Sequence, residues 1–298
     1  MKKNVFSMVF CLLIMLISMP APVYADIGPK PSVVIDFAGL ATEKYYVTLL
    51  SEMASTGPYS ALGVHPNNQR YHEGDEEYEI WEKFLSYKDK DGYYFLQYFS
   101  DCTENSRFTW GYYPPHKFKI LLYFPEYDKF VVSEEVYERY AFHSYYKVDA
   151  TDLAIQSVTQ VANIKAVKNY DYTWELISLL ARILATITIE VLIALLFGFR
   201  AKKQLYIIGI TNIVTQSILN VLLNITNYYH GSLMFVFNYL WMEALVIFIE
   251  LKVYSVFLPR YSSTETRKKW PVPLYALTAN GVSLGIGFYL AYLIPGIF

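Results

Sequence analysis

Six polar side chains lie inside long apolar stretches of the C-terminal half, where they could carry ion or proton chemistry. They are Glu190, Asn212, Gln216, Glu243, Glu250 and Asn280. Carboxyl and amide groups are costly in hydrocarbon and usually face the interior of a helix bundle, where they line transport paths or bind one another. These residues form the candidate intramembrane polar cluster of the chain.

The spacing of these residues places them on shared helix faces. Asn212 and Gln216 are four residues apart, and the two acids of the third stretch are seven apart, so each pair lies on one side of a helix. Glu190, Asn212, Glu250 and Asn280 each lie about eight residues from the end of their stretch next to a basic connection, roughly 12 Å at the helical rise per residue. We expect these four side chains to meet in one layer.

Two interpretations of this cluster are open. In the structural one, Asn and Gln amides hydrogen-bond protonated Glu190 and Glu250 and hold the helices together. In the functional one, the carboxylates line a cation or proton path or hold a polar ligand, because several acids are more than helix packing requires. Neither interpretation calls for a metal or an organic cofactor.

Four apolar stretches must position these residues, at about 173–198, 204–226, 233–258 and 272–295. Each is near the roughly 20 residues that cross about 30 Å of hydrocarbon. The first and third connections carry several Arg and Lys, whereas the middle connection carries neither. Because basic connections favour the cytoplasmic side, the chain is predicted to be a multi-pass protein of the cell membrane with its C-terminus outside.

The N-terminus has the features of a secretory signal peptide over residues 1–25. Two lysines precede an apolar run, and a Val-Tyr-Ala sequence that ends at Ala25 fits the pattern of small residues at a cleavage site. An uncleaved fifth helix is the alternative. In either case the segment 26–171 is expected to lie outside the cytoplasm, as an extracytoplasmic head.

The residue pattern of 26–171 predicts an α+β head with a mainly antiparallel sheet and short helices, followed by an all-α four-helix transmembrane bundle over 172–298. Runs of β-branched and aromatic residues predict strands at 31–37, 44–50, 93–99, 108–113, 118–124 and 130–132. Amphipathic spacing predicts a helix at 76–85, and capping at Ser133 predicts another that reaches Tyr140. A helical stalk is expected over 151–168.

The composition of the head narrows its partners. The head has 14 Lys and Arg against 22 Asp and Glu, so it is a poor partner for nucleic acid, whose phosphates require the opposite charge. It also has 18 tyrosines. Tyrosine is common where proteins meet ligands or other proteins, which favours an aromatic recognition face. The alternative is that these rings pack on the strands, where tyrosine is also favoured.

Motifs for catalysis are missing from the sequence. It has no GxSxG, HExxH, P-loop or GxGxxG motif, and no histidine or aspartate falls inside an apolar stretch. Intramembrane metalloproteases and aspartyl proteases need those residues, so we expect a non-enzymatic protein. The segment from Asp89 to Gly92 resembles the start of a calcium loop, but the closing glutamate of such a loop does not follow, and we interpret it as a turn.

Several tracts resemble a family of bacterial integral membrane proteins of unassigned activity. They are DIGPKPS at 26–32, WGYYPPHKFKILLYFPE at 110–126, YERYAFHSYY at 137–146, TNIVTQSILN at 211–220 and ALVIFIE at 244–250. The resemblance implies the same architecture, with a signal peptide, an extracytoplasmic head and a C-terminal four-helix membrane region in a bacterial envelope. It assigns no catalytic residue.

Three functions remain open from the sequence. The first is a head that binds or senses an extracytoplasmic ligand or partner, with the bundle as anchor and relay. The second is a small ion- or proton-coupled transporter that uses the intramembrane carboxylates. The third is an accessory subunit of a membrane complex, suggested by short cytoplasmic connections.

Overall fold

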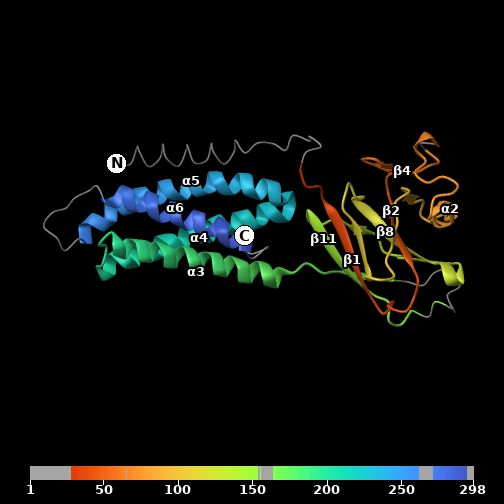
Figure 1. The fold of residues 1–298 in the computed structure, drawn as a ribbon, viewed down its shortest axis with the longest axis horizontal. Helices are drawn as coiled ribbons and strands as arrows, with labels where there is room; N and C mark the ends of the chain where they lie inside the picture. Colours follow the sequence, from red (N-terminus) through yellow and green to blue (C-terminus); the bar gives the residue numbers. More distant parts are fainter. Residues whose placement is uncertain (1–27, 65, 154, 156–163, 262–270, 294–298) are drawn as a thin grey trace.

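The computed structural model describes residues 28–64, 66–153, 155, 164–261 and 271–293, arranged as a head of strands and a bundle of long helices placed end to end (Figure 1). The expected signal peptide, most of the expected stalk over 151–168, the third connection at 262–270 and the last five residues lie outside the described residues.

The head contains two larger sheets and one small hairpin. The first sheet has the strand order β12-β11-β1-β7, from β1 (Ser32–Ala38), β7 (Arg107–Trp110), β11 (His143–Asp149) and β12 (Ala166–Lys168). The second sheet has the order β10-β8-β2-β5, from β2 (Tyr46–Ser51), β5 (Tyr94–Phe95), β8 (Lys117–Phe124) and β10 (Tyr137–Glu138). Two further strands extend it: β6 (Ser100–Asp101) pairs with β2, and β9 (Lys129–Val132) pairs with β8. The hairpin joins β3 (Ser55–Thr56) and β4 (Tyr59–Ser60).

The pairing is antiparallel throughout these sheets except between β1 and β11, which run parallel. The expectation of a mainly antiparallel sheet followed by helices is therefore confirmed. The parallel pair brings the start of the head next to the segment that leads toward the helices, because β11 is followed by β12 and then by the first long helix.

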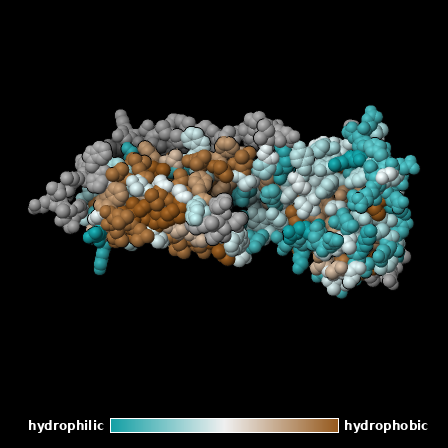
Figure 2. Space-filling view, viewed as in Figure 1, coloured by the Kyte–Doolittle hydropathy of each residue, from teal (hydrophilic) through white to brown (hydrophobic). Residues whose placement is uncertain are grey.

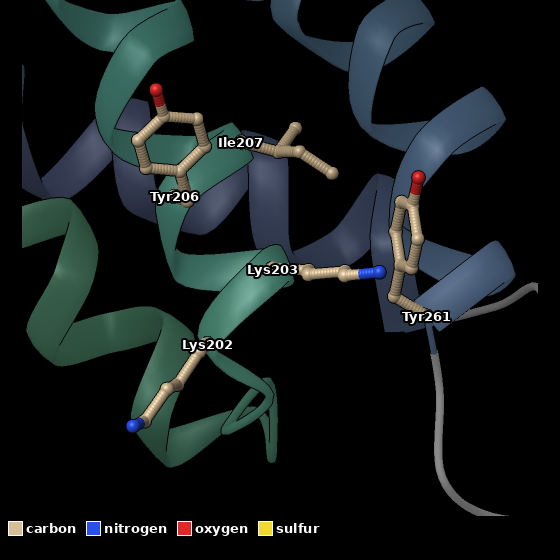
Figure 3. A pocket seen from close by; sticks show the side chains of 5 residues that line it. All are labelled: Lys202, Lys203, Tyr206, Ile207 and Tyr261. Atoms are coloured by element: carbon tan, nitrogen blue, oxygen red, sulfur yellow. The ribbon is translucent and has the colours of Figure 1, made fainter.

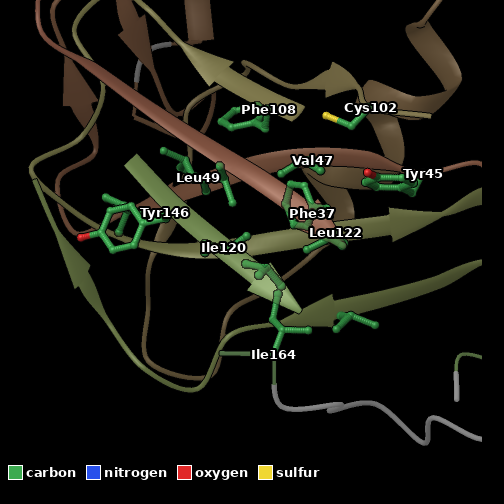
Figure 4. Close-up of a cluster of buried hydrophobic side chains, with 14 of the residues drawn as sticks. Phe37, Tyr45, Val47, Leu49, Cys102, Phe108, Ile120, Leu122, Tyr146 and Ile164 are labelled. Carbon is green, nitrogen blue, oxygen red and sulfur yellow. The ribbon is translucent and has the colours of Figure 1, made fainter. Parts of the chain in front are cut away.

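The main core of the head lies between the two sheets (Figure 4). Alternate residues of β2, such as Val47 and Leu49, face this core, while Tyr46 and Leu50 face the other side. A short helix, α2 (Tyr78–Ser86), covers that second side through Trp81 and Phe84 and confirms the helix expected at 76–85. Because β2 is covered on both faces, all of its residues are buried.

Two expectations for the head are wrong. The segment after Ser133 is not a helix, because Ser133 Oγ instead accepts the backbone N–H of Ile120 at 3.0 Å and donates to Glu135 O at 2.9 Å, and strand β10 follows. The described end of the expected stalk, Ala166–Lys168, is strand β12, paired with β11. In both places pairing with a distant strand supplies the backbone hydrogen bonds that a local helix would otherwise provide.

The turn at Asp89 forms an ion pair with a buried lysine. Lys119 on β8 is 1% exposed, and its ammonium donates to both oxygens of Asp89 at 3.0 Å and also to Asp91. Burial disfavours the ammonium, but the hydrogen bonds that it donates to Asp91 and Asp89 outweigh this effect and raise the pKa of Lys119. The turn predicted from the sequence therefore uses its carboxylates to neutralise a lysine of the neighbouring sheet.

Four long helices form the bundle within the described residues: α3 (Tyr172–Leu196), α4 (Lys202–His230), α5 (Ser232–Phe257) and α6 (Pro271–Leu293). α4 packs against α3 and α5, and α6 closes the other side against the same two helices. α3, α4 and α5 with its one-turn extension Leu258–Tyr261 are long and apolar enough to cross a membrane. These three support a membrane protein, and the fourth crossing stays a prediction.

The bundle buries many polar side chains among its apolar ones and exposes an apolar surface. On α4 the buried side chains include Gln204, Asn212 and Gln216, whereas Ile213 and Ile218 are at least half exposed. Figure 2 shows the consequence, an apolar surface over the helices and a hydrophilic surface over the head. A water-soluble bundle has the opposite arrangement, so the surrounding medium of these helices is expected to be lipid.

Candidate functional site

The helical stripes expected from the sequence face the inside of the bundle. The six predicted residues, Glu190, Asn212, Gln216, Glu243, Glu250 and Asn280, are each at most 7% exposed. One comes from α3, two from α4, two from α5 and one from α6. Residues four or seven apart share one face of a helix, so the two predicted residues of α4 are buried together, as are the two of α5.

A set of hydrogen-bonded residues, which we call the carboxylate cluster, lies deep in the bundle. It comprises Glu190, Asn212, Thr215, Glu250, Tyr254 and Asn280. In its first half, Asn212 Nδ2 lies 2.7 Å from Glu190 Oε2 and 3.0 Å from the Tyr254 hydroxyl. Behind them the Tyr275 hydroxyl donates to the backbone oxygen of Glu190 at 3.3 Å.

The second half of the cluster surrounds Glu250, whose two carboxyl oxygens both have donors. Thr215 Oγ1 donates to Oε1 at 2.7 Å, and Asn280 Nδ2 donates to Oε2 at 2.8 Å. Thr215 also lies 3.4 Å from the backbone oxygen of Asn212, which links the two halves. The structure thus brings together Glu190, Asn212, Glu250 and Asn280, one from each helix.

The two halves differ in how their oxygens are satisfied. Among the described residues, neither Glu190 Oε1 nor Asn212 Oδ1 has a hydrogen-bond partner, and both residues are 0% exposed. Leaving a buried acceptor unpaired costs about 1–3 kcal/mol. Because both atoms are acceptors, only a group that brings a donor or a positive charge could satisfy them. A proton or a small cation would do so.

The remaining predicted residues lie outside this cluster. Asn220 Nδ2 bonds to the backbone oxygen of Gln216 at 2.8 Å and to Gln216 Oε1 at 3.3 Å, so these two amides form a pair of their own on α4. Glu243 lies about two turns nearer the head than Glu250 and one turn from the buried hydroxyl of Tyr239. The layer expected from the sequence therefore has four members, and Gln216 and Glu243 lie nearer the head.

Polar contacts continue from the carboxylate cluster toward the head. Thr186 and Ser283 hydroxyls lie 3.2 Å apart, and farther on Arg182 Nη2 donates to Asn224 Oδ1 at 2.7 Å. This series ends in a hollow of about 150 Å³ lined by Glu175, Ser178, Arg182, Asn224, Asn227, Ser232 and Phe235. At the other end a packed apolar group that includes fully buried Tyr254 and Tyr275 separates the cluster from the far end of the bundle.

Sequence reasoning missed Thr215, Tyr254 and Tyr275. A hydroxyl group is ordinary in an apolar helix, so neither Thr nor Tyr stands out there as a carboxylate does. The available signal was spacing, because Tyr254 follows Glu250 by four residues and therefore lies on the same face of α5.

The head contains a second candidate site, a pocket of about 400 Å³ that the sequence did not indicate. We call it the head pocket, and it is lined by Val136, Tyr137, Glu138, Arg139, Tyr140, Tyr146, Ala166 and Lys168. Three different strands contribute to it, β10, β11 and β12. Pairing of distant segments creates this pocket, so no local motif could predict it.

The head pocket adjoins the contact between head and bundle. Tyr140, one of its walls, has its ring centroid 6.4 Å from that of Tyr228 on α4. Two residues later, the backbone N–H of Phe142 donates to the backbone oxygen of Tyr228 at 2.7 Å. Tyr170 packs on the same ring at 5.0 Å. These tyrosines form a joint between head and bundle, so they serve packing here rather than an exposed recognition face.

A further hollow, of about 410 Å³, lies at the opposite end of the bundle (Figure 3). Lys202, Lys203, Tyr206, Ile207 and Tyr261 line it, and the Lys203 ammonium lies 5.2 Å from the centre of the Tyr261 ring. Lysine with tyrosine is the composition expected of a membrane interface. The position agrees with the basic first connection read from the sequence.

Comparisons with known proteins add no assignment: no family model, curated protein or solved structure matches the chain.

Proposed function

We propose that this chain is a non-enzymatic protein of the bacterial envelope whose extracytoplasmic head binds a ligand and passes the binding to a membrane-embedded bundle. The observation that carries the proposal is the position of the head pocket. Its wall residue Tyr140 packs against Tyr228, and Phe142, two residues on, bonds to the backbone of the same helix. A ligand that moves β10 or β11 therefore acts directly on the end of α4.

The close fit at the joint supports this relay. Gly231, between α4 and α5, has φ +81°, and a Cβ there would lie 2.6 Å from the Phe142 ring. Only glycine allows this approach. Tightly packed contacts transmit displacement because interiors are dense and resist compression.

The test uses the purified full chain in nanodiscs and a panel of small probes that includes inorganic phosphate, acetate, glucose and glycine. Support is a saturable rise in thermal stability with one probe, together with altered hydrogen exchange at the head-facing end of α4. A Tyr140→Ala variant should keep its fold and lose the change in α4. Binding with unchanged exchange in α4 would remove the relay, and the absence of any saturable probe would count against the binding role.

A second function, ion- or proton-coupled transport, is favoured by a different observation. Glu190 Oε1 and Asn212 Oδ1 are buried in the bundle with no donor among the described residues, which suits a site that exchanges a proton or small cation. Proteoliposomes with wild type, Glu190→Gln and Glu250→Gln test it by proton and sodium flux. Flux that is equal in all three proteins, or no greater than in empty vesicles, rejects transport through this cluster.

A further inference from the structure

We propose that the head pocket is an anion site that takes a phosphate group through Arg139 and Lys168. This inference rests on the proposed function of the head as a ligand-binding element and names the chemistry of the ligand.

The charges around the pocket are unequal. Glu135, near its rim, pairs with Lys165 at 3.4 Å, and Glu138 points to Lys117 at 3.7 Å. Both acids thus have cations of their own. Within the part of the chain that the structure describes, Arg139 has no ion pair, and Lys168 has only the Tyr140 ring, 4.7 Å from its ammonium. The pocket therefore presents two positive groups without a carboxylate to neutralise them.

Arg139 is the more informative of the two. Its Nε is buried and has no hydrogen-bond partner among the described residues. Burial also lowers the pKa of its guanidinium, since removal from water disfavours the charged form. A half-buried guanidinium without a counter-ion is costly, and an anion that accepts hydrogen bonds from its planar fork removes that cost.

The tyrosines of the pocket are fixed by the protein itself. The Tyr146 hydroxyl donates to Glu138 O at 2.5 Å, and the Tyr140 hydroxyl donates to Tyr145 O at 2.6 Å. The Tyr137 hydroxyl accepts the backbone N–H of Ala166 at 2.8 Å. Their rings consequently act as rigid walls, and the charged recognition is left to Arg139 and Lys168.

Phosphate suits this arrangement better than a single carboxylate. It carries several acceptor oxygens, enough for the bidentate guanidinium and for a separate ammonium. A volume of about 400 Å³ also leaves room for a group attached to the phosphate. The rings of Tyr137 and Tyr146 provide an amphipathic surface for that group.

The position of the pocket allows two sources of phosphate. Lys168 precedes Asp171, the N-cap of α3, by three residues, and the exposed aromatic residues Tyr172 and Trp174 follow at once. The pocket therefore lies next to the level at which lipid headgroups are expected. The phosphate comes either from a lipid headgroup or from a soluble compound.

The experiment measures the thermal stability of the full chain in a neutral detergent, with inorganic phosphate titrated against chloride at equal ionic strength. A parallel arm compares nanodiscs of phosphatidylglycerol and of phosphatidylcholine. The variants are Arg139→Gln and Lys168→Gln, and Lys165→Gln is the matched control, because it removes a nearby lysine that already has a partner.

We expect a saturable rise in wild type and in Lys165→Gln, a response at least tenfold weaker in Arg139→Gln, and an intermediate one in Lys168→Gln. Without ligand, Arg139→Gln should be at least as stable as wild type, because it removes a desolvated charge. A response to inorganic phosphate identifies a soluble source, and a response to phosphatidylglycerol alone identifies a lipid source.

The inference is overturned if wild type responds to neither arm, or if Arg139→Gln responds as wild type does. Its failure can be told apart from failure of the proposed function. Saturable binding of a neutral probe such as glucose, lost in Tyr140→Ala, would reject the anion site and leave the binding role of the head standing.

Discussion

Replacement of Glu190 by glutamine should stabilise the bundle, and replacement of Glu250 by glutamine should not. Glu190 Oε1 and Asn212 Oδ1 are both buried acceptors without donors, beside the bond from Asn212 Nδ2 to Glu190 Oε2. The amide introduced by Glu190→Gln keeps one oxygen for Asn212 Nδ2 and adds an N–H₂ that can donate to Asn212 Oδ1. The variant thereby replaces one unpaired acceptor with a donor.

The size of the effect follows from that hydrogen bond. An unpaired buried acceptor costs about 1–3 kcal/mol, and a bond between membrane helices contributes about 0.6 kcal/mol on average, with measured values up to about 1.7. We therefore expect Glu190→Gln to add about 1 kcal/mol. In Glu250→Gln the amide oxygen can keep the Asn280 donor, and the amide nitrogen can donate to Thr215 Oγ1, whose own proton then bonds to Thr211 O at 2.9 Å, so we expect little change in stability.

Thermal unfolding of the purified full chain in detergent near pH 7 measures both variants against wild type. Glu190→Leu is the matched control for side-chain size, and it should be destabilising because Asn212 Nδ2 loses its bond to residue 190 while Asn212 Oδ1 gains no donor. Equal shifts of one sign for Glu190→Gln and Glu250→Gln would refute the reasoning, since the two carboxyl groups would then be equivalent. A rise with Glu190→Gln would indicate a site held at a cost in stability and would direct work to flux assays.

Three further outcomes are expected. Lys119→Met should cost the head about 3–5 kcal/mol, measured by urea unfolding, because it leaves the buried carboxylate of Asp89 without its counter-ion. Adding Asp89→Asn should recover part of the loss, and additive losses would contradict this. Gly231→Ala should separate head from bundle, because its methyl would lie 2.6 Å from the Phe142 ring, and faster proteolysis at the joint would show it, whereas unchanged proteolysis would argue against a tight joint. In a variant that lacks Cys11 of the expected signal peptide, Cys102 should not react with a thiol reagent at pH 8 until the head unfolds. Burial raises the pKa of the Cys102 thiol to about 12, and the reaction needs the thiolate; rapid labelling of the folded chain would contradict this.

Local patterns in the sequence determined the helices and the burial of the polar stripe. Apolar length and helical periodicity depend on residues a few positions apart, so the starts of α3, α4 and α5 lie within two residues of those expected. Glu190 and Glu250 stood out because a carboxylate in an apolar stretch is costly. The hydrogen-bond partners of Glu250 could not be predicted in this way, because Thr215 and Asn280 reach it from two other helices.

The strand pairing and the pocket of the head depended on the tertiary structure. The segment after Ser133 carries a helix-capping pattern, yet pairing of β10 with β8 overrides it. The parallel pair β1–β11 joins residues more than a hundred positions apart. The head pocket brings together Arg139, which follows β10, and Lys168 on β12 through the pairings of β10 with β8 and of β12 with β11. Sheets take their hydrogen bonds from distant strands, whereas helices take theirs from the next turn. For that reason the sequence alone determined the bundle's helices and its polar stripe, and the pocket and the joint with α4 existed only once the strands had assembled.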